Sequence, residues 1–206
     1  MTKGQLIVLD GKTVRRSHDR TNGKAAIHLV SAWATHNGVV RGQVKVDDKS
    51  NEITVIPELL KMLEIEGCII SIDAKGTQKE IVSTILEQKG DYLLALKQNQ
   101  KQLFQQIKFI YSIDRKNDFK DAPYTYAKTV EKNHGRIETR QCWVTSDPEY
   151  IRYVYPEGSW ESLKSIVMID ATRKERVKTT SQSRYFISSL QISAAQMMKQ
   201  ASTLGD

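Results

Sequence analysis

The chain has 206 residues, of which 39% are hydrophobic and 27% are charged, a balance typical of a folded soluble protein and unlike that of a disordered one. Its apolar runs are too short to span a bilayer and its first ten residues do not resemble a signal peptide, so we expect a cytoplasmic protein without a membrane segment. The formal net charge is +7, from 31 Lys and Arg against 24 Asp and Glu.

The positive charge is concentrated in two stretches. Residues 1–24 hold six basic against two acidic residues, and residues 171–184 hold five against one. Such clusters favour polyanionic partners, because each contact with a phosphate releases condensed counterions. Many basic proteins bind no nucleic acid, so charge alone leaves that question evenly open.

Strands and helices alternate in the first half. Residues 5–10 form a β-branched apolar run that ends in an acid, which is typical of a buried strand. Two more strands are predicted on either side of His36-Asn37-Gly38, a hairpin signal. The full set of predicted elements is strands at 5–10, 25–35 and 39–46, a helix at 51–64, a strand at 67–73, a helix at 78–88, a strand at 92–96 and a helix at 102–111. This order predicts an α/β fold with a mixed sheet flanked by helices.

The second half is predicted to be rich in strands. Four strand-like segments are separated by polar or Pro- and Gly-containing turns, and a helix begins near residue 192; the strands are expected at 124–130, 136–145, 164–171 and 178–190. The two cysteines, Cys68 and Cys142, lie in apolar contexts without metal-binding spacing, so we expect them to be buried as small hydrophobic residues.

Two acids follow buried strands in the first half. Asp10 ends the first predicted strand and Asp73 ends the fourth. If those strands are neighbours, their carboxylates meet at one edge of the sheet, where Mg²⁺ could be held between them and substrate phosphates. A pair of such ions can activate water and stabilise the leaving oxygen during phosphodiester cleavage. Taken singly, an Asp after a strand more often caps a turn, so the pair leaves the two interpretations nearly even.

Four motifs in this order resemble those of the H-repeat (Rhs-element-associated) transposases, which are DDE transposases of ISAs-type insertion sequences. They are Leu9-Asp10-Gly11-Lys12-Thr13-Val14-Arg15, Asp73-Ala74-Lys75-Gly76-Thr77-Gln78, His134-Gly135-Arg136-Ile137-Glu138-Thr139-Arg140 and Arg184-Tyr185-Phe186-Ile187-Ser188-Ser189-Leu190. The resemblance extends from about residue 6 to about residue 199.

The resemblance implies a ribonuclease H-like mixed sheet with a β-rich insertion. We therefore expect a catalytic core in residues 1–120, the insertion in 121–190 and the start of the C-terminal helix in 191–206. It also implies Mg²⁺- or Mn²⁺-dependent cleavage and joining of DNA strands at insertion-sequence ends. Asp10 and Asp73 are then the first two metal-binding acids.

The resemblance places a third acid on a helix after the Ile-Ser-Ser-Leu strand, in a His-Trp-x-Ile-Glu-Asn-x-x-Leu-His-Trp stretch that this sequence does not contain. We therefore expect a fragment truncated at both ends that is inactive alone. Glu138 is a catalytic candidate in its place. However, alternation along a strand puts Arg136, Glu138 and Arg140 on one face, which favours an ion-pair ladder or a DNA-facing group over a metal ligand.

Five residues are candidates for contacting DNA: Lys12, Arg15, Arg16, His134 and Arg136. For the last two, the alternative of solvated turn residues is equally good. Two further functions stay open, a non-catalytic DNA-binding remnant and a standalone metal-dependent nuclease that uses Asp10, Asp73 and Glu138. Self-association is also compatible with the apolar surface expected near the last strand.

Overall fold

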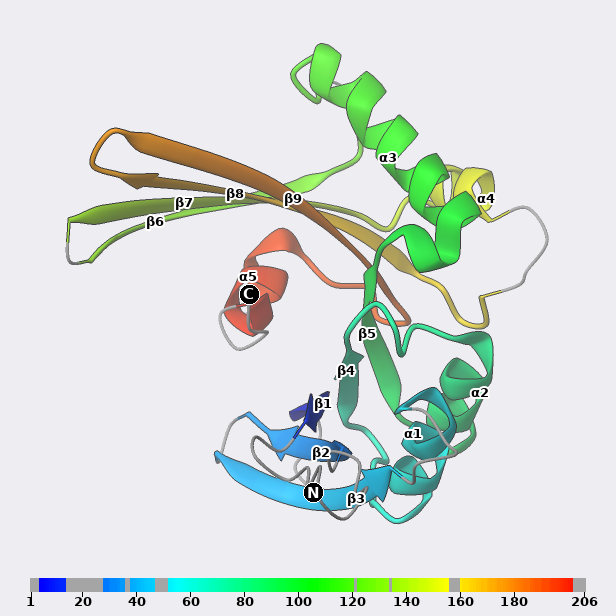
Figure 1. Cartoon of the computed structure of the whole chain (residues 1–206). Coiled ribbons are helices and arrows are strands. Elements are labelled where there is room, and N and C mark those ends of the chain that lie inside the picture. Colours follow the sequence, from blue (N-terminus) through cyan, green and yellow to red (C-terminus); the bar gives the residue numbers. More distant parts are fainter. Residues whose placement is uncertain are drawn as a thin grey trace. The chain divides into compact units, whose positions relative to one another are not determined.

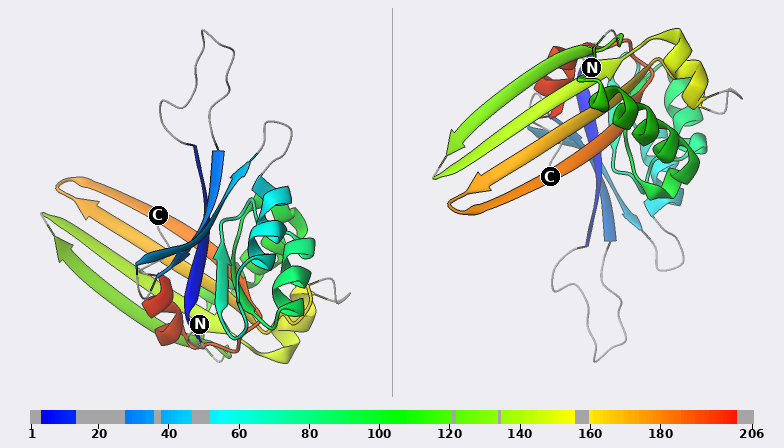
Figure 2. Two further views of the ribbon diagram at one scale, coloured as in Figure 1. Left: turned by 90° about the horizontal axis from the view of Figure 1, so that it is seen from below. Right: turned by 90° about the horizontal axis from the view of Figure 1, so that it is seen from above.

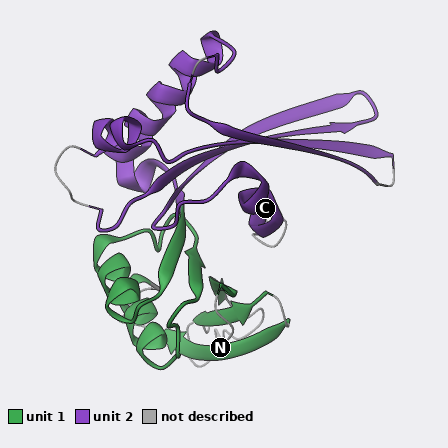
Figure 3. Cartoon of the chain, turned by 180° about the vertical axis from the view of Figure 1, so that it is seen from behind, with its two compact units in different colours: residues 1–94 green, residues 95–206 purple. Residues whose placement is uncertain are grey.

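The computed structural model describes residues 4–13, 28–35, 38–46, 52–120, 122–133, 135–155 and 160–201. The chain forms two compact units, residues 1–94 and residues 95–206 (Figure 3). The predicted functional boundary at residue 120 remains a prediction, since a compact unit need not coincide with a catalytic core. No helix of the described residues is long and apolar enough to cross a membrane.

The first unit contains a mixed sheet and two helices (Figure 1). Its elements are β1 (Leu6–Thr13), β2 (His28–Ala34), β3 (Val39–Val46), α1 (Glu52–Lys61), β4 (Ile69–Ile72), α2 (Lys79–Glu87) and β5 (Asp91–Leu96), the last of which runs across the boundary between the units. The strand order is β3-β2-β1-β4-β5. The strands β1, β2 and β3 form an antiparallel meander, whereas β4 is parallel to both β1 and β5.

Apolar residues of these strands form the core of the first unit, and β4 is buried at all four positions. Ile7 and Leu9 of β1, with Ile70 and Ile72 of β4, are at most 3% exposed. Leu59 of α1 is completely buried as well, and α1 packs against β2, β3 and α2. The core thus anchors β1 and β4 along one face of the sheet and holds their ends in place.

Two details of the first unit differ from the sequence predictions. The strand β1 does not end at Asp10 but continues to Thr13, because its antiparallel pairing with β2 extends to Thr13 opposite His28. The helix α1 was predicted at 51–64 and runs from Glu52 to Lys61, so it ends earlier than predicted, and it contains Pro57. The predicted hairpin residues His36 and Asn37 lie outside the described residues, although β2 and β3 pair as an antiparallel hairpin requires.

The second unit is built on a long antiparallel sheet with the order β9-β8-β7-β6. Its elements are η1 (Gln98–Gln100), α3 (Lys101–Lys116), β6 (Thr125–Asn133), β7 (Arg136–Thr145), α4 (Pro148–Val154), β8 (Ser165–Glu175), β9 (Lys178–Ser188) and α5 (Ala194–Ala201). All four predicted strands are confirmed, and β6 and β8 are longer than predicted.

Helices cover opposite faces at one end of this sheet (Figures 1 and 2). From α3, the buried Tyr111 hydroxyl lies 2.9 Å from the carbonyl oxygen of Ile166 and 3.1 Å from that of Trp143. On the other face, the backbone N–H of Ala194 at the start of α5 donates to Thr125 Oγ1 of β6. The distal halves of the strands extend beyond both helices, and their residues 173–183 are exposed.

The helix α4 was not predicted. Its N-cap is Asp147, whose Oδ1 accepts hydrogen bonds from the backbone N–H groups of Glu149 at 2.8 Å and Tyr150 at 3.3 Å, and Pro148 occupies the first helical position. An Asp-Pro pair in these positions is a recognised helix start, so the signal was present in the sequence. The expectation for the cysteines is confirmed, since Cys68 and Cys142 are both completely buried.

Candidate active site

Asp10 and Asp73 each follow the last paired residue of two neighbouring parallel strands. The register of β1 and β4 runs from Leu6 opposite Ile69 to Leu9 opposite Ile72. Asp10 is the next residue of β1, Asp73 is the first residue after β4, and both are exposed. The two acids therefore lie at the carboxyl end of this parallel pairing.

A polar row leads across the sheet to Asp10. Asp10 is paired with Ser31 of β2, and Ser31 is paired with Gln43 of β3. The Gln43 side-chain amide donates to Ser31 Oγ at 2.9 Å. Ser31 belongs to no motif of the sequence, since only the register of the antiparallel meander brings it beside the acid.

The turn after β4 holds Asp73. The backbone N–H of Gly76 donates to Asp73 Oδ1 at 3.1 Å, and Thr77 Oγ1 donates to the Asp73 carbonyl oxygen at 3.2 Å. Gly76 is required here, because a Cβ at this position would lie 2.2 Å from Ile72 Cγ2. The Gly76 hydrogen bond fixes Oδ1 of the Asp73 carboxylate, and Oδ2 can accept a further ligand.

The donor chemistry of this pair fits a hard divalent cation. Mg²⁺ takes oxygen ligands and is usually held by one or two protein carboxylates, with water and substrate phosphate completing its octahedron. Asp10 supplies one carboxylate from within β1, and Asp73 supplies another from the turn after β4. Within the described ranges, no group of three His, Cys, Asp or Glu side chains is arranged to hold a metal ion.

Glu138 lies in the second unit and is held by arginines. It is on β7, 7% exposed, and Arg136 Nη2 donates to its Oε2 at 2.9 Å, while Arg140 Nη2 pairs with Oε1. Arg140 also pairs with Glu131 of β6 at 3.3 Å. The structure therefore confirms that these side chains share one face of the strand, and both Glu138 oxygens are already bound to guanidinium groups.

Of the five candidates for DNA contact, the structure describes two. Lys12 is exposed on β1, two residues beyond Asp10 and thus on the same face of the strand. Arg136 is half-buried at the start of β7, where it pairs with Glu138. Arg15, Arg16 and His134 lie outside the described residues. Their predicted roles remain predictions.

A family model described as the transposase DDE domain matches residues 1–199. The chain belongs to this transposase family. This match confirms the resemblance that the four motifs indicate. H-repeat proteins are among the similar proteins.

Similar proteins of this transposase family occur in Escherichia coli. "Putative transposase YncI" from strain O157:H7 is 40% identical over 198 residues, covering 94% of this chain and 49% of the relative. "H repeat-associated putative transposase YhhI" from strain K12 is 40% identical over 196 residues, covering 92% of this chain and 50% of the relative. "H repeat-associated putative transposase YbfD" from strain K12 is 46% identical over 144 residues, covering 70% of this chain and 56% of the relative. The chain thus spans about half the length of the curated relatives it matches.

Proposed function

We propose that the chain is the ribonuclease H-like catalytic domain of a DDE transposase, which cleaves and joins DNA strands at insertion-sequence ends in the bacterial cytoplasm. The observation that carries the proposal is the register of β1 and β4, because Asp10 and Asp73 each come directly after its last paired residues, Leu9 and Ile72. The order of elements and the strand order β3-β2-β1-β4-β5 support a core of this kind. So does membership of the transposase family.

In this proposal, Asp10 and Asp73 hold Mg²⁺ or Mn²⁺ against the phosphodiester. When bound, such ions supply an activated water or hydroxyl nucleophile and stabilise the leaving oxygen. The protein positions the ligands. Asp10 is fixed by pairing with β2, Asp73 by the N–H of Gly76, and Lys12 supplies a cation for a DNA phosphate on the same face.

Glu138 is the substitute candidate for a third metal ligand, but its two oxygens pair with Arg136 and Arg140. We therefore propose that Asp10 and Asp73 hold the metal ions without Glu138. Chemistry of this kind needs its metal ions held tightly, so both acids should be needed for binding.

Mn²⁺ binding tests the metal site directly. Electron paramagnetic resonance titration of the full chain should show saturable Mn²⁺ binding that Asp10→Asn or Asp73→Asn weakens at least about tenfold, since each removes a charged ligand. Asp91→Asn is the matched control, because Asp91 begins β5, at the opposite end of the parallel strands. Absence of saturable binding, or equal loss in the control, would overturn the proposed site.

A second candidate function is DNA binding without catalysis. It is favoured by the engagement of Glu138 with two arginines, together with the exposed basic residues Arg173, Lys174, Arg176 and Lys178 around the end of β8. Filter binding to duplex DNA at several salt concentrations distinguishes the candidates. DNA binding without catalysis would be favoured by salt-dependent binding with no cleavage in Mn²⁺, even when an acidic helix segment from a longer relative is supplied. Cleavage in Mn²⁺, with or without that segment, would reject this second candidate.

A further inference from the structure

The face of the first unit's sheet that carries Asp10 is organised in rows. Cross-strand partners in an antiparallel sheet share a face, so the pairing of β2 with β1 and β3 sets the side chains of that face opposite one another. The rows are Val8, Trp33 and Val40; Asp10, Ser31 and Gln43; and Lys12, Leu29 and Lys45. Asp10 therefore lies in the middle row, which is polar throughout, whereas both neighbouring rows contain a large apolar residue of β2.

Ser31 is the polar residue of β2 on this face. Its neighbours on the same face of the strand are Leu29 and Trp33. The strand β2 lies between β1 and β3, and Ser31 is half-buried there. A hydroxyl group that gives up part of its water needs hydrogen-bond partners in exchange. The two side chains beside it in the row, Gln43 and Asp10, are the ones that can supply them.

Gln43 determines which way the Ser31 hydroxyl is used. Gln43 Nε2 donates to Ser31 Oγ at 2.9 Å. A hydroxyl group has one O–H donor and two acceptor lone pairs, so this bond occupies an acceptor position and leaves the O–H to donate. The acceptor on the opposite side is the Asp10 carboxylate. Directly opposed residues of antiparallel strands have Cβ atoms about 4.5–5.5 Å apart, within reach of a hydrogen bond between a serine and an aspartate.

The other acid of the proposed site is held in a comparable way. The Gly76 N–H donates to Asp73 Oδ1 at 3.1 Å and sets the orientation of that carboxylate. Asp10 lies within β1, where the backbone N–H groups are used in pairing, so a neighbouring side chain must supply the donor. Outer hydrogen-bond partners of this kind orient metal ligands and tune how tightly the ion is held.

We propose that Ser31 is a positioning residue for Asp10 and that Gln43 fixes the direction of its hydroxyl. Gln43 donates to Ser31, Ser31 donates to one oxygen of Asp10, and the other oxygen is left for the metal ion. The proposal rests on the proposed function, since it takes Asp10 as a metal ligand. It adds two residues to the site, neither of which touches the ion.

Mn²⁺ titration of the full chain, followed by electron paramagnetic resonance, tests the role of both residues. Ser31→Ala should weaken Mn²⁺ binding about tenfold, the lower end of the effect of losing an outer partner of a metal ligand. Ser31→Thr keeps a hydroxyl and should retain the wild-type affinity. Gln43→Leu leaves the hydroxyl in place but without a fixed direction, so it should weaken binding less than Ser31→Ala does.

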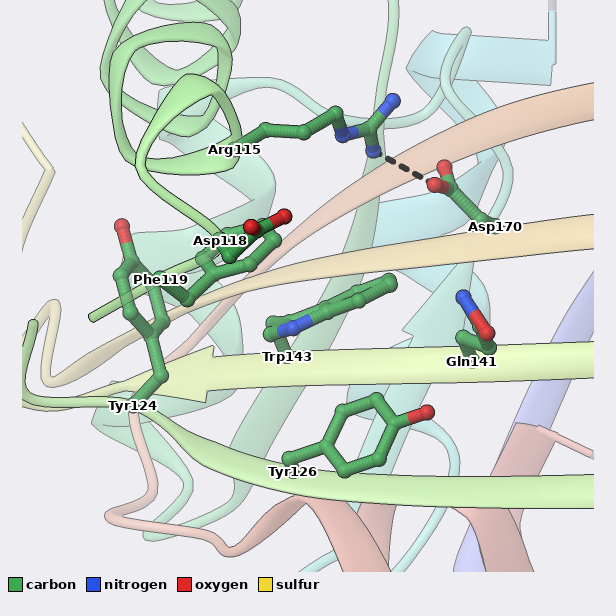
Figure 4. A pocket seen from close by; sticks show the side chains of 8 residues that line it. All are labelled: Arg115, Asp118, Phe119, Tyr124, Tyr126, Gln141, Trp143 and Asp170. Atoms are coloured by element: carbon green, nitrogen blue, oxygen red, sulfur yellow. Dashed lines mark hydrogen bonds and ion pairs between the residues drawn. The ribbon is translucent and has the colours of Figure 1, made fainter.

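Two matched controls come from the second unit. Ser181→Ala removes an exposed serine hydroxyl from a cross-strand pair with Thr172. Gln141→Leu removes a strand glutamine that lines a pocket beside Trp143, which is itself stacked on Phe119 (Figure 4). Neither residue belongs to the row of Asp10, so both controls should leave Mn²⁺ affinity unchanged. Urea unfolding of every variant identifies any that loses the fold.

A double-mutant cycle with Asp10→Asn separates positioning from general disturbance of the sheet. If Ser31 acts through Asp10, Ser31→Ala should cost no further affinity once Asp10→Asn is present, because the carboxylate that it orients is gone. Unchanged affinity in Ser31→Ala, an equal loss in Ser31→Thr, or an equal loss with and without Asp10→Asn would overturn the role of Ser31 and leave the metal site intact. Absence of saturable Mn²⁺ binding by the wild-type chain would overturn the proposed function as well.

Discussion

Replacing Glu138 by Gln separates the two roles proposed for its carboxylate. As an ion-pair partner, Glu138 contributes to the stability of the second unit through Arg136 and Arg140. As a metal ligand, it would contribute to Mn²⁺ binding instead. The amide of Gln has nearly the same shape but no charge, and it directs a donor toward one of the two guanidinium groups.

The structure allows the cost of this change to be worked out. The Glu138 side chain is 9% exposed and that of Arg140 is 17% exposed, while Arg136 at 36% retains contact with water. Removing one partner of a buried ion pair costs about 3–5 kcal/mol, because an uncompensated charge remains buried. Since one of the two arginines can be resolvated, we expect Glu138→Gln to lower the free energy of unfolding by about 2–3 kcal/mol.

Glu131→Gln is the matched control. Glu131 pairs with the same Arg140 at 3.3 Å, but its side chain is 62% exposed. Exposed pairs contribute about 0–1 kcal/mol, so the control should lose less than about 1 kcal/mol. Urea unfolding monitored by tryptophan fluorescence measures both variants. Equal losses would refute the reasoning from burial, and a Mn²⁺ affinity reduced as far as by Asp10→Asn would show that Glu138 is a ligand.

Three further predictions concern other residues. Gly76→Ala should cost about 1–3 kcal/mol and weaken Mn²⁺ binding, because the new Cβ forces the turn that fixes Asp73 away from Ile72; unchanged Mn²⁺ affinity would contradict this. Tyr111→Phe removes a buried hydrogen bond to backbone carbonyl oxygens and should cost about 1 kcal/mol in urea unfolding, and a neutral effect would argue against that bond. Burial raises the pKa of the Cys142 thiol to about 12. The contribution of the neutral thiol to the free energy of unfolding is therefore complete below the unfolded-state pKa near 9 and is lost as the pH rises toward 12. Between pH 8 and 11, the free energy of unfolding should fall less for Cys142→Ala than for wild type, and an equal fall in both would refute this.

The sequence predicted the described elements of both units other than η1 and α4, because their hydrophobic periodicity is local. The apolar run before Asp73 and the alternation around Glu138 each specify a strand and its faces without reference to the rest of the chain. The approach of the two acids needed one more assumption, that the first and fourth strands are neighbours. The parallel pairing of β1 with β4 confirms it.

Features that depend on distant residues could not be predicted. The strand β1 extends past Asp10 only because β2 continues beside it, so the Asp-Gly turn signal is overridden by pairing. The support of Trp143 by Phe119 depends on two left-handed residues after α3 for which the sequence has no glycine. The helix α4 is different, since its start at Asp147-Pro148 is a local signal that depends on no distant residue.

The strand order has a consequence for how the protein behaves at high concentration. The strand β3 is an outer strand of the order β3-β2-β1-β4-β5, and an outer strand can pair with another molecule. Two exposed cations, Arg41 and Lys45, lie along it. A second copy of β3 added at this edge would bring these cations close to their counterparts, so we expect them to protect the sheet against aggregation. Neutralising Arg41 and Lys45 together should therefore increase light scattering on concentration.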